Sequence, residues 1–370
     1  GFWTLRRPMF FRHAAFVLLA CVALAAAGGR DTDTANHTQW LVDNLANQLD
    51  SILNNQSAAG GRDLTNAALG ALILFDDQTY ACATAIKFLR RFGARYDMSF
   101  GGEAVPAVFH LGFSKCFDGD DRTFFVNAIN ASLPQTPAAA TGQDVAYTNM
   151  YLMATVESIL FGELAAALTD SLGGDDGMRA RGLESTRVGY EMWDGWLNYT
   201  ASAGIHEFVS PTYTNVQLSA LYLGNMFVSG GPNGIRRRQF RVALDYIWAE
   251  VAGSYYPPAG ALSGPHSRDY DTLLGHGMAL VDIYVQSTRA TRSVSGVASS
   301  GAGFPGTIPL RCEKLDPHCE GAPNGWMPTV GTGEPMTCLA LTLLNAIHPE
   351  GYAIKKEHVA VASMSNKEVR

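Results

Sequence analysis

The sequence has few charged residues, little alternation of apolar and polar residues, and none of the phosphate-loop, dinucleotide-binding or zinc-helix motifs. Only 16% of its 370 residues are charged, and the formal net charge is −7. An acidic chain does not attract the phosphate backbone, so we expect no nucleic-acid partner. The scarcity of strand-like alternation favours helices. The hydrophobic content of 47% predicts that these helices bury a large core.

The N-terminal residues have the pattern of a secretory signal peptide. Arg6, Arg7 and Arg12 precede an apolar run over residues 14–27, which ends in small residues and Gly28-Gly29. The run is shorter than the roughly 20 apolar residues of a membrane-spanning helix. We therefore assign residues 1–29 to a signal and expect a secreted protein with no stable membrane span after signal removal. A signal anchor is the alternative.

Cysteines and glycosylation sequons agree with export. Cys21 lies in the signal, which leaves five cysteines in the mature chain and predicts disulfide bonding. Cys312 and Cys319 bracket a short loop that is typical of a disulfide, and a metal site formed with His318 lacks a second ligand pair. We therefore predict no metal and assign no cofactor. The sequons of the expected glycoprotein begin at Asn36, Asn55, Asn130 and Asn198.

Apolar residues recur at spacings of three and four, as in Phe240, Leu244, Ile247 and Val251, and this spacing predicts amphipathic helices. Between residues 95 and 145 we expect short helices mixed with loops. Helices joined by short loops pack antiparallel, so residues 30–350 are interpreted as an all-α domain of hairpins in an α/α toroid. Residues 351–370 form a tail, in which 357–362 is typical of a strand and of the start of a β-domain. The helices are predicted over 38–54, 63–76, 78–94, 146–168, 182–202, 210–228, 234–252, 269–290 and 336–347.

Polar segments precede or open three of these helices. Ser210 is a good N-cap and Pro211 a good first helical residue, so a helix should begin there. If successive helices alternate in direction, those over 146–168, 210–228 and 269–290 are parallel, and their N-termini share one rim. We expect ten polar residues at this rim: Asp144, Tyr147, Asn149, His206, Glu207, Tyr213, His266, Arg268, Asp269 and Asp271. Gln217 and His276 should lie one and two turns deeper along their helices.

Two basic or aromatic stretches are interpreted as structural. The arginines at 236–238 with Arg241 lie on a helix that has an apolar opposite face, which is typical of a solvated surface. The aromatic residues between 190 and 199 have helical spacing, which favours core packing over a sugar-binding platform.

The arrangement of long helical hairpins resembles that of the α/α-toroid polysaccharide lyases and glycosidases. The segments over 207–213 and 267–271 resemble those of uncharacterised secreted or bacterial toroid proteins. The resemblance in architecture covers residues 38–350, whereas in detail it covers only these two segments. It implies an extracellular polysaccharide as the partner and substrate, cleaved either by elimination or by hydrolysis.

In an elimination, Tyr213 would act as base and acid at a uronic acid. His206 or His266, together with Arg268, would neutralise the substrate carboxylate and stabilise the enolate-like intermediate. The coexistence of tyrosine, histidine and arginine favours this mechanism slightly.

In a hydrolysis, Glu207 paired with Asp269 or Asp271 would supply the acid and the base. The alternative to both mechanisms is a non-catalytic glycan-binding or scaffold protein, in which Arg268 with Glu207 or Asp269 forms a structural ion pair. We thus predict catalytic roles for Glu207, Tyr213, His266, Arg268 and Asp269. The predicted substrate-binding residues are Asp144, Tyr147, Asn149, His206, Gln217, Asp271 and His276.

Overall fold

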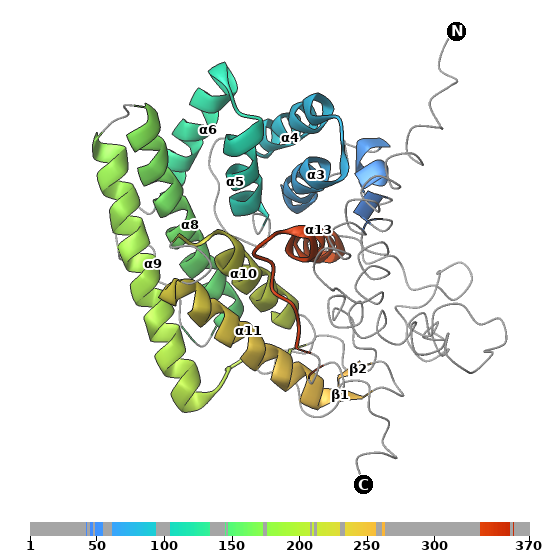
Figure 1. The fold of residues 1–370 in the computed structure, drawn as a ribbon, viewed down its shortest axis with the longest axis vertical. Coiled ribbons are helices and arrows are strands. Elements are labelled where there is room, and N and C mark those ends of the chain that lie inside the picture. The colour runs from blue at the N-terminus through green and yellow to red at the C-terminus, as the bar shows by residue number, and fades with distance from the viewer. Residues whose placement is uncertain are drawn as a thin grey trace, which may run out of the picture.

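The computed structural model has an all-α fold, as predicted (Figure 1). The strands among the residues that the structure describes are β1 (Tyr255–Tyr256) and β2 (Ala261–Leu262), a short antiparallel pair with Tyr255 opposite Leu262. The structure describes residues 42, 45–46, 49–54, 61–93, 104–133, 145, 147–172, 176–207, 209–210, 213–229, 234–256, 261–262, 334–355 and 358.

Seven of the predicted helices are present with similar bounds, and α5 and α6 account for much of the region expected to hold short helices. The largest difference is α9, which begins six residues before the predicted position 182. The helix predicted over 38–54 is described only in part. The one over 269–290 lies outside the described residues, as does nearly all of the strand predicted over 357–362. The helices are α3 (Gly61–Leu74), α4 (Gln78–Phe92), α5 (Val105–Lys115), α6 (Gly119–Ser132), α8 (Thr148–Leu172), α9 (Asp176–Ala203), α10 (Tyr213–Phe227), α11 (Ile235–Ser254) and α13 (Glu334–Ile347).

A disulfide between Cys82 and Cys116 joins α4 to the end of α5, across 34 residues of sequence. Asp77 starts α4 by accepting hydrogen bonds from the backbone N–H groups of Thr79 and Tyr80 at 3.0 and 3.2 Å. The disulfide confirms the predicted disulfide bonding and is typical of an oxidising compartment.

The two longest helices, α8 and α9, form an antiparallel hairpin with very close backbones. A Cβ added to Gly162 would lie 2.6 Å from the carbonyl oxygen of Gly182, and one on Gly189 would lie 2.6 Å from Ile159. By length and composition alone, the segment Thr148–Thr169 could span a membrane, but 72% of an apolar 18-residue stretch within it is buried in the protein. The core helix of a globular protein has the same properties, and α8 packs against α9 and α10.

Contacts at both ends of α10 show that it runs parallel to α8. Just before α10 begins, Glu207 accepts a hydrogen bond from the backbone N–H of Asn149, in the first turn of α8. Just after α10 ends, the backbone N–H of Ser229 donates to Glu163, about four turns further along α8. The alternation of helix direction that was predicted for this part of the chain is therefore confirmed.

The helix α11 turns back against α10. Phe240 of α11 lies against Gly224, and the indole N–H of Trp248 donates to the hydroxyl of Tyr222 at 3.2 Å. On its other side, Phe240 stacks on Trp193 of α9 with ring centroids 4.0 Å apart. Trp193 and Trp196 are both buried, so the aromatic residues of α9 belong to the core, as predicted.

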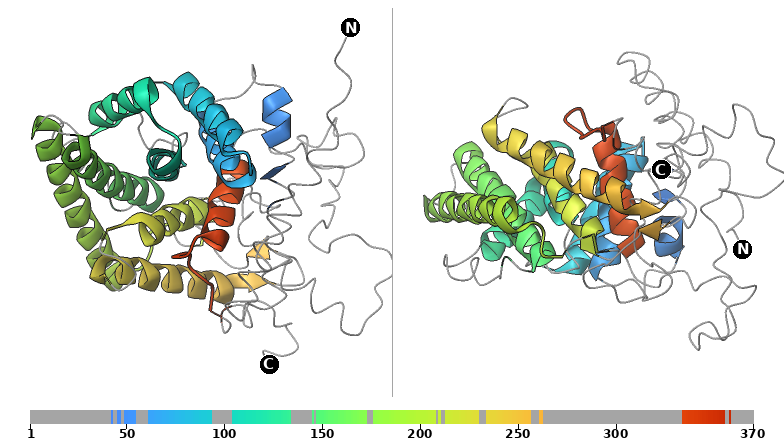
Figure 2. Two further views of the ribbon diagram at one scale, coloured as in Figure 1. Left: turned by 45° about the horizontal axis from the view of Figure 1, so that its top comes forward. Right: turned by 90° about the horizontal axis from the view of Figure 1, so that it is seen from below.

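Five helices pack in a closed order. Each of α3, α5, α8 and α10 packs against the next, and α13 packs against both α10 and α3. In Figure 2, α9 and α11 lie outside α8 and α10. We call α3, α5, α8, α10 and α13 the inner helices. An α/α toroid requires such an order, although the toroid itself stays a prediction.

Candidate functional site

A strained turn precedes α10 and places Glu207. Val209 has φ of 42°, in the left-handed region that a β-branched residue rarely adopts. Gly204, at φ 78°, ends α9 without strain because it has no Cβ. The hydroxyl of Ser210 accepts a hydrogen bond from the backbone N–H of Tyr213 at 3.1 Å, so Ser210 is the predicted N-cap. Backbone strain of this kind often accompanies a functional segment.

The carboxylate of Glu207 is completely buried and lies at the start of α8. Its Oε2 atom accepts a hydrogen bond from the backbone N–H of Asn149 at 2.8 Å. The first turn of a helix has free N–H groups and a partial positive charge, which stabilise a carboxylate there. Two of the three polar segments that the sequence predicted to meet are therefore in contact.

The other described residues of the predicted site divide into buried and exposed groups. Tyr213 and Gln217 of α10 are 8% and 1% exposed. Tyr147 is 52% exposed, and His206 is exposed with its Nδ1 3.4 Å from the hydroxyl of Tyr199. The predicted site residues that lie outside the described residues are Asp144, His266, Arg268, Asp269, Asp271 and His276.

The most unusual feature of this end of the fold is a set of buried polar atoms that have no hydrogen-bond partner among the described residues. All belong to the first turn of α8 or to the first two turns of α10, and their residues are at most 3% exposed. We call these residues the polar cluster. The atoms are Thr148 Oγ1, Asn149 Oδ1, Thr214 Oγ1, Asn215 Oδ1, Gln217 Nε2 and Ser219 Oγ.

Hydroxyl groups elsewhere in α8 behave differently. Thr155 and Thr169 each donate to the carbonyl oxygen four residues earlier, at 2.7 and 2.9 Å. The hydroxyls of Thr214 and Ser219 do not make this local bond. A buried polar group without a partner is unfavourable by about 1–3 kcal/mol, so such groups require an explanation.

The polar cluster occupies more than one face of α10. Thr214 and Gln217, three residues apart, share one face, whereas Asn215 and Ser219, four apart, share another. A further buried group lies nearby on α9. The hydroxyl of Tyr151, in α8, donates to the carbonyl of Met192, in α9. Trp196 lies one turn after Met192, and because α9 runs antiparallel to α8, Trp196 is level with the first turn of α8. The indole N–H of Trp196 also has no partner within the described part of the chain.

The chemistry available at this end is hydrogen bonding by uncharged groups beside one carboxylate. Amide oxygens accept, the amide nitrogen donates, and the hydroxyls do both. Within the described ranges, no group of three or more histidine, cysteine or acidic side chains is arranged to hold a metal ion.

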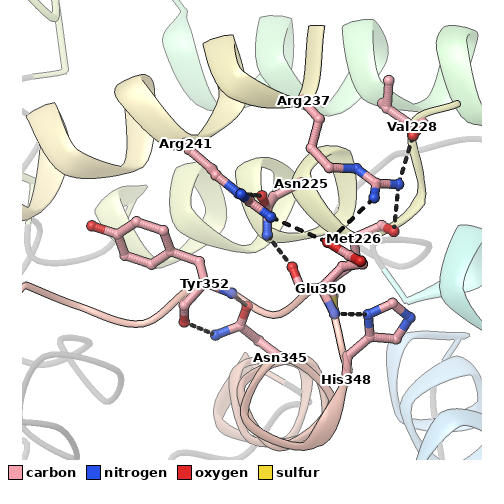
Figure 3. Close-up of polar contacts among 9 residues, drawn as sticks. All are labelled: Asn225, Met226, Val228, Arg237, Arg241, Asn345, His348, Glu350 and Tyr352. Carbon is pink, nitrogen blue, oxygen red and sulfur yellow. Dashed lines mark hydrogen bonds and ion pairs between the residues drawn. The ribbon is translucent and has the colours of Figure 1, made fainter. Parts of the chain in front are cut away.

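At the opposite end of the inner helices, a charged network ties the chain after α13 to α10 and α11 (Figure 3). Arg237 donates to the carbonyl oxygens of Met226 and Val228 at 3.2 and 2.8 Å, which caps the C-terminus of α10. Glu350 pairs with Arg237 at 3.5 Å and with Arg241 at 3.2 Å. The prediction of a solvated surface is thus wrong for Arg237, which is only 6% exposed.

Two histidines contact the ring of Phe227 beside this network. The imidazole of His110 stacks on Phe227 with ring centroids 4.8 Å apart, and that of His348 meets it edge-on at 5.2 Å. Burial, followed by the nearby His348, lowers the pKa of His110 to about 4. Burial also lowers the pKa of His348, whose Nδ1 accepts a hydrogen bond from the N–H of Glu350 at 3.1 Å.

The sequence did not predict this network, because its members lie on α5, α10, α11 and the segment after α13. Asn345 shows how the segment is held: its amide donates to the carbonyl of Tyr352 at 2.9 Å and accepts from the N–H of Tyr352 at 2.7 Å. The hydroxyl of Tyr352 then donates to Asp245 at 2.6 Å, and Lys355 pairs with the same carboxylate. These groups are mutually satisfied, which is typical of a structural clasp.

Comparison with known proteins supports no particular activity. Residues 139–300 match a family described as a domain of unknown function, DUF8769. This stretch covers less than half of the chain, and it contains α8, α9, α10 and α11 together with the whole polar cluster. No curated protein and no solved structure matches the chain.

Proposed function

We propose that the chain is a secreted carbohydrate-active protein that cleaves a polysaccharide, with the polar cluster as part of its glycan site. The observation that carries the proposal is the set of buried, uncharged polar atoms that lack a partner among the described residues. Sugar hydroxyls donate and accept at the same time, so they would satisfy amide oxygens, amide nitrogens and hydroxyls together. The Cys82–Cys116 disulfide and the N-terminal signal pattern support export.

The reaction is elimination or hydrolysis, and the two assign different roles. In elimination, Tyr213 is the general base, and its backbone is held in place by the Ser210 cap. In hydrolysis, Glu207 provides one carboxyl group and Asp269 or Asp271 the other. The hydrogen bond from the backbone N–H of Asn149 holds Glu207 in one orientation, which both a general acid and a general base require.

A specific observation favours a second candidate function, non-catalytic glycan binding. The carboxylate of Glu207 is completely buried and bound to the start of α8, so it also serves as a helix cap. A cap of this kind positions the polar cluster without taking part in proton transfer. The protein would then recognise a glycan and leave it intact.

The deciding experiment treats purified protein with a panel of neutral and uronate-containing polysaccharides. Absorbance from unsaturated uronate products means elimination, whereas new reducing ends without that absorbance mean hydrolysis. Binding without either product means the glycan-binding alternative. A protein that neither binds nor cleaves any of these polysaccharides would refute the proposal.

Two conservative variants separate the roles. Tyr213→Phe should abolish elimination but leave hydrolysis largely intact, and Glu207→Gln should do the reverse. Because Glu207→Gln also weakens the cap on α8, its thermal unfolding should be measured in parallel. Thr155→Val is the matched control, since the hydroxyl of Thr155 is satisfied within its own helix.

A further inference from the structure

The chain that follows α13 turns at His348, which holds the turn with three hydrogen bonds. The backbone N–H of His348 donates to the carbonyl of Leu344 at 2.8 Å and closes the end of α13. Its carbonyl oxygen accepts from the N–H of Gly351, and its ring Nδ1 accepts from the N–H of Glu350 at 3.1 Å. We call residues 348–355 the strap, because they are bound to both α10 and α11 (Figure 3).

The hydrogen bond to the ring of His348 exists only while the histidine is neutral. Because Nδ1 accepts, the ring proton of neutral His348 is on Nε2, and an added proton goes to Nδ1. A protonated Nδ1 is a donor, and it faces the N–H of Glu350, which is also a donor. Protonation therefore removes one of the bonds that hold the turn.

The surroundings of the His348 ring do not stabilise a positive charge. Among the described residues, the titratable and charged groups beside it are His110 of α5, Arg237 of α11 and Glu350 of the strap. The carboxylate of Glu350 is already shared by two arginines of α11. From α10 comes the uncharged ring of Phe227, which contacts both histidines. Burial chiefly lowers the pKa of His348, and the charge of Glu350 opposes this effect while that of Arg237 adds to it.

The contacts between α10 and α11 do not depend on the strap. Arg237 caps α10 through the carbonyls of Met226 and Val228, and neither bond involves residues 348–355. The indole N–H of Trp248 in α11 donates directly to the hydroxyl of Tyr222 in α10. The two helices therefore remain paired if the strap leaves them.

We infer that the strap is an acid-sensitive latch: protonation of His348 releases residues 348–355 from α10 and α11, while the helices stay packed. Release uncovers a polar surface. Asn225, which is 0% exposed, loses its hydrogen bond to the carbonyl of Glu350, and the buried guanidinium of Arg237 loses its acidic partner. The latch contains no residue of the polar cluster, so it is separate from the proposed glycan site.

The direction of the effect follows from proton linkage. In the released strap, His348 has the ordinary pKa of 6.5, whereas in the bound strap its pKa is lower. The released form therefore takes up the proton first, and acid favours it as the pH falls below 6.5. A single histidine raises the ratio of released to bound strap by at most about 25-fold between pH 7 and pH 5.

Hydrogen exchange of the full chain, corrected for the intrinsic exchange rate at each pH, tests the inference by mass spectrometry. The reporters are the backbone N–H groups of Glu350, Gly351 and Tyr352, each of which is hydrogen-bonded within this turn. We expect their protection to fall at least fivefold from pH 7 to pH 5. Their exchange should not respond to low concentrations of urea, because local release exposes little surface. The amides of α8 should stay more protected at both pH values.

His348→Asn is the decisive variant. The side-chain oxygen of asparagine accepts the N–H two residues further on, as in an Asx turn, and it does not titrate. Protection at pH 7 should therefore be kept, and the fall at pH 5 should shrink to less than twofold. His348→Phe keeps an aromatic ring beside Phe227 without an acceptor, so the strap should be released at both pH values. In Glu350→Gln the fall should remain, because the histidine is still present.

Three results would overturn the inference. Equal protection at pH 7 and pH 5 in the wild-type protein would mean that the strap does not respond to acid. A fall in His348→Asn as large as in the wild type would place the responsible proton elsewhere. Strap and α8 amides with the same exchange rates and the same urea dependence would mean that only global unfolding releases the strap. Circular dichroism at both pH values shows that each variant is folded.

Discussion

Replacing Thr214 by valine should make the protein more stable, although most substitutions of buried residues destabilise. Valine has the shape of threonine without its hydroxyl, and the two residues have similar helix propensities. In the wild-type protein, the Thr214 hydroxyl is buried and has no partner among the described residues, so its removal recovers the desolvation free energy of that group. We expect a gain of about 1 kcal/mol in the free energy of unfolding, the lower end of the range for an unsatisfied buried group.

Thr155→Val provides the comparison. The Thr155 hydroxyl is equally buried but donates to the carbonyl of Tyr151 at 2.7 Å, so its removal should lower the free energy of unfolding by about 1 kcal/mol. The two matched substitutions should therefore differ by about 2 kcal/mol and in sign. Urea unfolding followed by tryptophan fluorescence measures this difference as a shift in midpoint at constant slope.

The reasoning is refuted if Thr214→Val destabilises as much as Thr155→Val. That result would mean that the Thr214 hydroxyl has a partner in the free protein. The hydroxyl would then give no support to a ligand site at the polar cluster. A stable Thr214→Val variant that no longer binds glycan would instead show the trade of stability for binding expected at functional sites.

Three further predictions concern the rest of the fold. The pKa of His110 is about 4 in the folded protein against 6.5 when unfolded, so stability should fall as pH drops from 6.5 towards 4, by about 3 kcal/mol in total. His110→Phe should flatten the dependence seen in urea midpoints at pH 7 and pH 5, and an unchanged slope with pH would contradict this origin. Reducing the Cys82–Cys116 bond should lower the free energy of unfolding by about 4 kcal/mol for its loop of 34 residues, measured with and without reductant. Gly162→Ala should separate α8 from α9 and cost about 3 kcal/mol or more, because its Cβ would lie 2.6 Å from the carbonyl of Gly182; Gly253→Ala, with open space around it, should change the melting temperature little.

The helices were predictable because apolar spacing and capping residues are local signals. Ser210 fixed the start of α10, and the apolar positions of α11 appear in the structure as its buried face. The early start of α9 was missed because Gly177 and Gly182 weaken helix propensity. Close packing of Gly182 against α8 overrides that weakness, and such packing leaves no local mark in the sequence.

The meeting of Glu207 with Asn149 followed from helix direction alone, which explains why it could be predicted. The burial of Arg237 could not. Its side chain was assigned to a polar helix face, but the carbonyls that it caps belong to α10, and its acidic partner Glu350 lies more than 100 residues away. The catalytic roles proposed for Tyr213 and Glu207 remain predictions.

The packing of α13 against α3 affects how the protein is made. About 260 residues separate the end of α3 from the start of α13, and a ribosome adds roughly 5–20 residues per second. Some 13–50 seconds therefore pass in which α3 has emerged and its last neighbour does not yet exist. During synthesis, the apolar surface of α3 that α13 later covers therefore stays uncovered by α13 until the end of the chain is made.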